Sequence, residues 1–259
     1  MSADHILLVD EAAPGIRVLT LNRPDKCNAL STALLAAVAA RCRAAAVDTS
    51  VRCVVIAAAG PAFCAGADIA EMRDGGPHAV GEPERQRQWA VIEQFPKPLI
   101  AAVEGPAFGG GNELAMLADI VVTGANARFG QPEVGIGGMP GDGGTQRLVR
   151  AVGKSLAMQM ILTGKPIDAG TALHSGLVSE CVQAGSALAR AMEIAGEIAA
   201  GAPLAAMAAK QCVLRAFDCG LSCGLALEQR AMLNVAHSKD RAEGLAAFLE
   251  RCTPRFIGQ

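Results

Sequence analysis

Three consecutive glycines, Gly109 to Gly111, are the feature that most constrains how this chain folds. An apolar run over 99–103 precedes them and predicts a buried strand, and a helix-forming run with one acid, Glu113, follows them. Because glycine has no side chain, a ligand can approach the backbone closely where strand gives way to helix. The first amides of a helix lack an internal acceptor and lie at the positive end of its dipole. The stretch therefore predicts a site that stabilises negative charge.

A second acid, Glu133, lies in another glycine-rich segment, and the residues alone leave open whether the two acids share a site. Glu113 could be a first-turn acid that complements the helix dipole, and Glu133 could be a surface loop residue. In the same segment, Asp142 is expected to cap a helix that begins near Gly143. A loop of small residues, 60–69, follows a predicted strand and can present backbone amides to a ligand.

Composition excludes several classes of function. The 259 residues are 51% apolar and 19% charged, which predicts a sizeable core. A net charge of −2, one tryptophan and no tyrosine argue against a nucleic-acid partner. No apolar run reaches the ~18–20 residues that span a bilayer, and the first residues lack the apolar core of a signal peptide, so no membrane association is expected.

Cysteine and histidine are placed without a metal-binding pattern. The nine cysteines are scattered without a CxxC pair, and the four histidines are isolated. Neither a disulfide framework nor a metal site is therefore expected, and reduced cysteines favour a cytoplasmic protein.

Hydrophobic periodicity and turn residues predict an α/β core over residues 1–200 and a helical region over 201–259. The arginines of the helix after position 83, Arg85 and Arg87, are expected on a solvated face. Strands are predicted over 6–9, 16–21, 51–57, 99–103, 120–123 and 177–182. Helices are predicted over 32–47, 84–95, 143–152, 155–162, 186–200, 203–217, 222–237 and 240–251.

Several motifs, taken together in this order and spacing, resemble the crotonase family, also called the enoyl-CoA hydratase/isomerase family. They extend over nearly the whole chain, and they are 21–24 (LNRP), 62–69 (AFCAGADI), 97–105 (KPLIAAVEG), 109–116 (GGGNELAM), 129–133 (FGQPE), 141–148 (GDGGTQRL) and 248–251 (FLER).

The resemblance implies a spiral core of repeated ββα units, a C-terminal helical trimerisation region, and homotrimers that often pair into hexamers. It also implies an acyl-CoA thioester substrate and no cofactor, because CoA belongs to the substrate. In the family, the amides at the positions of Ala67 and Gly110 form the oxyanion hole for the thioester oxygen. The implied CoA contacts are Lys26, Cys27, the backbone around Ala65, Asp68 and Ile69, and, on a neighbouring subunit, Phe248 and Arg251.

Acids at both the Glu113 and Glu133 positions make this chain most similar to the hydratases of that family. By resemblance, Glu113 acts on the water that attacks C3, Glu133 exchanges the proton at C2, and the Gly141 amide helps to hold the water. An enoyl-CoA isomerase, a specialised hydroxyacyl-CoA dehydratase and a non-catalytic acyl-CoA-binding subunit remain as alternatives. Two departures bear on CoA and acyl binding: Ala70 stands where hydratases commonly have lysine, and the segment 74–83 is rich in glycine and proline.

Overall fold

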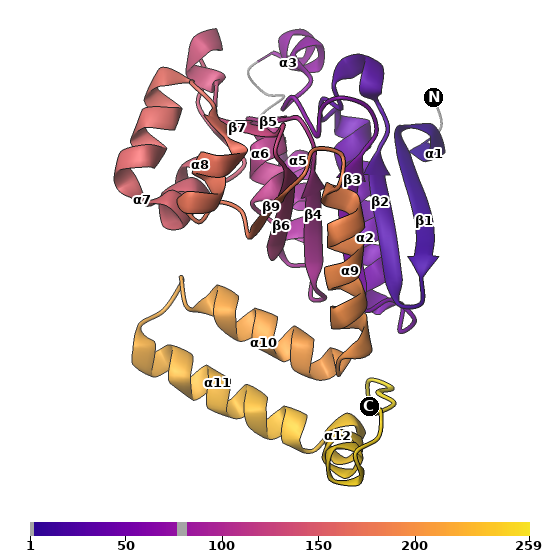
Figure 1. Cartoon of the computed structure of the whole chain (residues 1–259). Coiled ribbons are helices and arrows are strands. Elements are labelled where there is room, and N and C mark those ends of the chain that lie inside the picture. The colour runs from indigo at the N-terminus through magenta and orange to yellow at the C-terminus, as the bar shows by residue number, and fades with distance from the viewer. Residues whose placement is uncertain (1–2, 77–81) are drawn as a thin grey trace.

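Six strands form the central sheet in the computed structural model, which describes residues 3–76 and 82–259 (Figure 1). The first two strands form an antiparallel hairpin around Pro14 and Gly15, and each later neighbour in the sheet is parallel. In sheet order the strands are β1 (Leu7–Ala13), β2 (Ile16–Leu21), β3 (Cys53–Ala58), β4 (Leu99–Val103), β6 (Ile120–Gly124) and β9 (Glu180–Val182).

Helices cover both faces of this sheet, as the alternation of strand side chains requires. In β3, Val54 and Ile56 face the larger core, to which α2 (Thr32–Val47) and α5 (Pro83–Glu93) contribute. Cys53 and Val55 face the opposite side, against α9 (Ala187–Ala200). The start of α2 is capped by Ser31, whose hydroxyl accepts the Leu34 N–H at 3.2 Å.

A smaller sheet lies beside the first and supports the glycine-rich segments. Its order is β5 (Pro106–Phe108), β7 (Arg128–Gly130) and β8 (Ile167–Asp168). These strands have two or three residues. They cannot be predicted from hydrophobic periodicity, because they are too short to show an alternating pattern of apolar and polar side chains. The short elements around them are α1 (Ala3–Ile6), η1 (Pro24–Lys26), α3 (Ile69–Gly75), α6 (Gly110–Ala115), η2 (Glu133–Ile136) and α8 (Ala169–His174).

The last three helices extend away from the sheet as an arm, drawn in orange and yellow in Figure 1. They are α10 (Pro203–Arg215), α11 (Leu221–Ala236) and α12 (Lys239–Glu250). Asp240 ties the C-terminal segment to α12, because its carboxylate accepts the N–H groups of Ile257 at 2.7 Å and Gly258 at 2.9 Å. The arm carries large exposed apolar side chains, among them Val213, Phe217, Leu221, Leu225, Met232 and Leu249.

The longer predicted elements are confirmed to within a few residues, with three differences. The predicted helices over 143–152 and 155–162 form α7 (Gly144–Thr163), which is broken by non-helical backbone at Gly153. The strand predicted over 177–182 is reduced to β9, because Leu177 and Val178 belong to the turn after α8. The predicted irregular segment 74–83 lies partly outside the described residues.

Within the described ranges, no single helix is both long and apolar enough to cross a bilayer. The pair α9 and α10 passes the length and composition test only when taken together, across a bend of 113°.

Candidate active site

A cavity of about 630 Å³ lies where the loops around α3, α6 and α7 meet. Its volume falls in the range of small-molecule sites. Its walls come from segments that are distant in sequence, which only the fold brings together. Eight of the predicted site residues line it: Ala65, Ala67, Asp68, Ile69, Gly110, Glu113, Glu133 and Gly141.

The backbone amides of Ala67 and Gly110 are neighbours in this cavity. Isolated β-bridges join Leu30 to Ala67 and Cys64 to Ala107, so the loop after β3 runs beside β5. A Cβ placed on Gly110 would lie 3.6 Å from the Ala67 nitrogen. Among the described residues, neither N–H has a hydrogen-bond acceptor. Two adjacent free donors of this kind can stabilise a negatively charged oxygen.

Two glycines of the triplet are required by their surroundings. Gly109 has φ of +50°, and a Cβ there would lie 2.8 Å from Glu133 Oε1. A Cβ on Gly111 would lie 2.2 Å from the carbonyl oxygen of Cys64. A side chain at Gly111 would therefore push α6 away from the loop after β3 and separate the two free amides, and one at Gly109 would strain the backbone and displace the Glu133 carboxyl.

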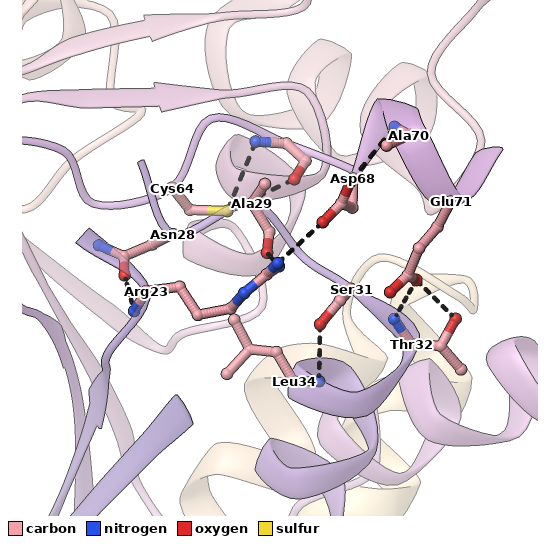
Figure 2. A network of polar contacts seen from close by, with 11 residues as sticks. Arg23, Asn28, Ala29, Ser31, Thr32, Leu34, Cys64, Asp68, Ala70 and Glu71 are labelled. Carbon is pink, nitrogen blue, oxygen red and sulfur yellow. Dashed lines mark hydrogen bonds and ion pairs between the residues drawn. The ribbon is translucent and has the colours of Figure 1, made fainter. Parts of the chain in front are cut away.

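A polar network holds the loop that carries Ala67 (Figure 2). Arg23 donates to Asp68 Oδ2 at 3.0 Å and to the Ala29 carbonyl at 2.6 Å, and Asp68 also caps α3 by accepting the Ala70 N–H. On the other side of α3, Glu71 accepts the N–H of Thr32 at 2.8 Å. The Asp68 side chain thus fixes the loop, and within this loop the Ala67 N–H stays available to a ligand.

Glu113 is a buried acid whose carboxylate is held by backbone amides. Its Oε1 accepts the N–H of Asp142 at 2.9 Å and that of Gly144 at 2.6 Å, and only 2% of the residue is exposed. Burial, followed by the charge of Asp142, raises the pKa of Glu113 to about 7, although the two amides act against the shift. The group can therefore gain or lose a proton near neutral pH.

Glu133 begins η2 on the opposite wall and has a similar environment. Burial raises the pKa of its carboxyl, and Asp142 acts in the same direction. Its Oε2 is buried and has no hydrogen-bond partner among the described residues. The amide of Gly141, in the loop before α7, also lacks an acceptor within the described part of the chain. The cavity thus combines two carboxyls of raised pKa with three free amides.

The expected role of Asp142 as a helix cap is wrong. Gly143 occupies the N-cap position of α7, and no side chain caps that helix. The Asp142 carboxylate instead pairs with Arg85 of α5 at 2.5 Å. Arg85 is therefore not on a solvated face, as its sequence context had indicated, but lines the cavity with 9% of its surface exposed. Arg85 comes four residues before Trp89, and its guanidinium carbon lies 5.8 Å from the centre of the Trp89 ring. This spacing was the only feature of the sequence that could have indicated a buried arginine.

Four predicted CoA contacts lie outside the cavity wall: Lys26, Cys27, Phe248 and Arg251. Lys26 and Cys27 end η1, where the Cys27 carbonyl accepts the N–H of Ala65 at 2.9 Å. Phe248 is 83% exposed on α12, and Arg251 ends that helix with φ of +58°. Contacts from these residues to CoA stay predictions. No group of three or more potential metal ligands occurs within the described residues.

Comparisons with known proteins identify the family of this chain. A family model described as enoyl-CoA hydratase/isomerase matches residues 11–259. A 2,3-dehydroadipyl-CoA hydratase of Escherichia coli is 46% identical over 94% of this chain and 96% of its own length. A mitochondrial enoyl-CoA hydratase of Pongo abelii is 40% identical over 94% of this chain and 84% of its own length.

A solved structure extends the agreement to the fold. The crystal structure of enoyl-CoA hydratase from Bacillus anthracis superposes with a TM-score of 0.93 at 37% identity, covering 98% of this chain and all of that one. The predicted fold class and the predicted hydro-lyase type of enzyme are thereby confirmed. The chain belongs to the enoyl-CoA hydratase/isomerase family.

Proposed function

We propose that the enzyme adds water in syn fashion to a 2-enoyl-CoA and so forms a 3-hydroxyacyl-CoA. One observation carries the proposal: the buried carboxyl of Glu113 and the half-buried carboxyl of Glu133, both of raised pKa, line the same cavity as the free amides of Ala67 and Gly110. A second cavity, of about 200 Å³, has a single acid among the described residues of its wall, Asp119, and so no pair of carboxyls.

The chemistry follows from where charge develops during hydration. Attack of water at C3 forms the new C–O bond and moves the double-bond electrons onto the thioester oxygen, where the Ala67 and Gly110 amides stabilise the enolate. Glu113, ionised, takes the proton of the attacking water, which the Gly141 amide helps to hold. Glu133, protonated, delivers a proton to C2 as the thioester carbonyl re-forms. Two carboxyls whose pKa values are both raised by burial can divide the roles of base and acid in this way.

The acyl group meets both apolar and charged walls. Ile69, Ile136 and Met139 line the cavity while 54%, 65% and 69% exposed, so they can contact an apolar acyl chain or the pantetheine arm. The relative named 2,3-dehydroadipyl-CoA hydratase adds a dicarboxylic acyl group to the substrates worth testing. We propose that no cofactor is needed, since CoA is part of the substrate.

A homotrimer, or a hexamer made of two trimers, is proposed for the assembly. The support is the exposed apolar surface of the C-terminal arm, which includes Phe217 and Leu221 and is typical of an interface. Residues 1–200 would then form the catalytic unit and 201–259 the oligomerisation region. A cytoplasmic location is proposed from the nine cysteines, all of them in the described residues and all free thiols.

The direct test follows the loss of enoyl-thioester absorbance when enzyme is added to short, medium, aromatic and dicarboxylic 2-enoyl-CoAs. A hydratase should lose most of its rate in both Glu113→Gln and Glu133→Gln, whereas Glu197→Gln, an exposed acid on α9, should behave like wild type. Inactivity of the wild type on every thioester would refute the proposal. An isomerase would keep much of its rate in Glu113→Gln, and tight CoA-ester binding without turnover would indicate a non-catalytic subunit.

A further inference from the structure

The cavity holds a third carboxylate, Asp142, which the proposed reaction does not use. Its side chain is 13% exposed, and that of its partner Arg85 is 10% exposed. The Arg85 Nη2 and Asp142 Oδ2 atoms are 2.5 Å apart. Of the described residues that line the cavity, Arg85 is the only one with a cationic side chain. Arg85 therefore supplies the positive charge among these lining residues, and it comes from α5.

Asp142 is directly connected to Glu113. The N–H of Asp142 donates to Glu113 Oε1, so any movement of Asp142 moves one of the two amides that hold the buried acid. The carbonyl of Asp142 in turn accepts from Arg147 Nη1 at 2.9 Å, and Arg147 pairs with Glu93. Arg85 and Glu93 are near opposite ends of α5. This helix thus holds the loop before α7 at two points.

The charges around Glu113 show why this connection matters for the reaction. The carboxylates that act on it are Asp142, from the loop before α7, and Glu133, from η2. Acids at the other side of the cavity, Asp68, Glu71, Asp74 and Glu82, come from α3 and the segments that flank it. Without Arg85, the full charge of Asp142 would act on Glu113 in a site with little water to screen it.

We propose that Arg85 is a positioning residue of this site: by pairing with Asp142 it offsets part of the charge of the third carboxylate, holds the loop that binds Glu113, and sets the pH range in which Glu113 is ionised. The inference rests on the proposed hydration of 2-enoyl-CoA. It assigns Arg85 and Asp142 no contact with substrate, and it makes the charge of the pair, rather than either residue alone, the controlling quantity.

The test is a double-mutant cycle read as the pH dependence of kcat/KM on crotonyl-CoA. Arg85→Gln leaves the Asp142 charge unbalanced, so the acid limb should move to higher pH by about 0.5–1 unit, equal to a further 3- to 10-fold loss well below the limb. Asp142→Asn leaves Arg85 unbalanced and should move the limb to lower pH. The double variant restores a neutral pair, and its limb should return close to that of wild type.

Two controls separate charge from shape. Arg85→Lys keeps the charge and should keep the wild-type limb. Arg87→Gln, on the same helix but 71% exposed at its side chain, should change neither rate nor limb. Circular dichroism and thermal melting report on folding, and if Arg85→Gln does not fold, Asp142→Asn still decides the direction of the shift.

Two results would overturn the inference. An equal loss of rate at every pH, with an unmoved limb in all variants, would mean that the pair is only structural. A KM that rises in Arg85→Gln for 2,3-dehydroadipyl-CoA alone, again with an unmoved limb, would mean that Arg85 binds an acidic acyl group. Failure of the proposed function is distinguishable, because the Glu113 carboxyl can be titrated by ¹³C NMR in each variant without turnover, with Glu113→Gln giving the assignment.

Discussion

Two acids close together in sequence, Glu104 and Glu113, make the same type of backbone contact in two regions of the molecule, with different consequences. Each carboxylate accepts two backbone N–H groups at the start of a helical segment through a single oxygen. Glu104 holds Gly185 at 2.9 Å and Ala187 at 3.0 Å, at the start of α9. Glu113 holds Asp142 and Gly144, at the start of α7.

The difference lies in what surrounds the second oxygen. Glu104 Oε2 is buried without a partner among the described residues, and Glu104 does not line the cavity. Glu113 lines the cavity beside Glu133, and its pKa is raised to about 7. The same pair of amide contacts therefore fixes a helix in one region and orients an acid–base group in the other.

Activity should separate the two acids most strongly. Glu113→Gln should lower kcat/KM on a 2-enoyl-CoA by about 1000-fold, because loss of a positioned acid–base group typically costs 10²–10⁴-fold. Glu104→Gln preserves shape and should stay within about threefold of wild type. Steady-state assays across several acyl groups provide the measurement, and equal losses in the two variants would remove the contrast.

The substitution Glu113→Gln, which lowers activity, should raise stability at neutral pH. Because the pKa of Glu113 is higher in the folded protein than its ordinary value of 4.5, its contribution is fully present below about pH 4.5 and is lost as pH rises through about 7. Relative to wild type, the free energy of unfolding of Glu113→Gln should therefore rise by up to about 3 kcal/mol between pH 4 and pH 8. Urea unfolding at both pH values measures the difference, and a constant difference between the two proteins would contradict a raised pKa.

Glu104→Ala should lower the free energy of unfolding by about 1–2 kcal/mol, because it leaves the amides of Gly185 and Ala187 without their acceptor. The activity of the folded fraction should be unchanged. Chemical denaturation and an assay of the same preparation give both quantities. A loss of activity without a loss of stability would contradict a purely structural role for Glu104.

The smallest effect is expected in the loop that carries the Ala67 amide. Asp68→Asn weakens the ion pair with Arg23, whose side chains are 16% and 15% exposed, but keeps an oxygen to cap α3. We expect KM to rise only about two- to fivefold, in line with about 0.5–1 kcal/mol for a pair of this kind. Steady-state kinetics measure it, with Asp10→Asn, an exposed acid of β1 that does not line the cavity, as the control.

Much of this molecule was predictable from local patterns. Ser31 before an alanine-rich run predicted the start of α2, and Pro14-Gly15 predicted the hairpin, because caps and turns depend on neighbouring residues only. The short strands β5, β7 and β8 were missed because they are stable only through pairing with one another. Asp142 was misjudged for a related reason, since its partner Arg85 comes from a distant helix.

The α/β class, the order of the main elements and the identity of the two acids follow from the sequence, because periodicity, glycine runs and motif spacing are properties of the chain alone. The packing of distant segments makes the amides of Ala67 and Gly110 neighbours, holds Glu113 against the loop before α7, and turns Arg85 inward. Protonation follows from burial and from nearby charge, and both are set by which distant segments pack together.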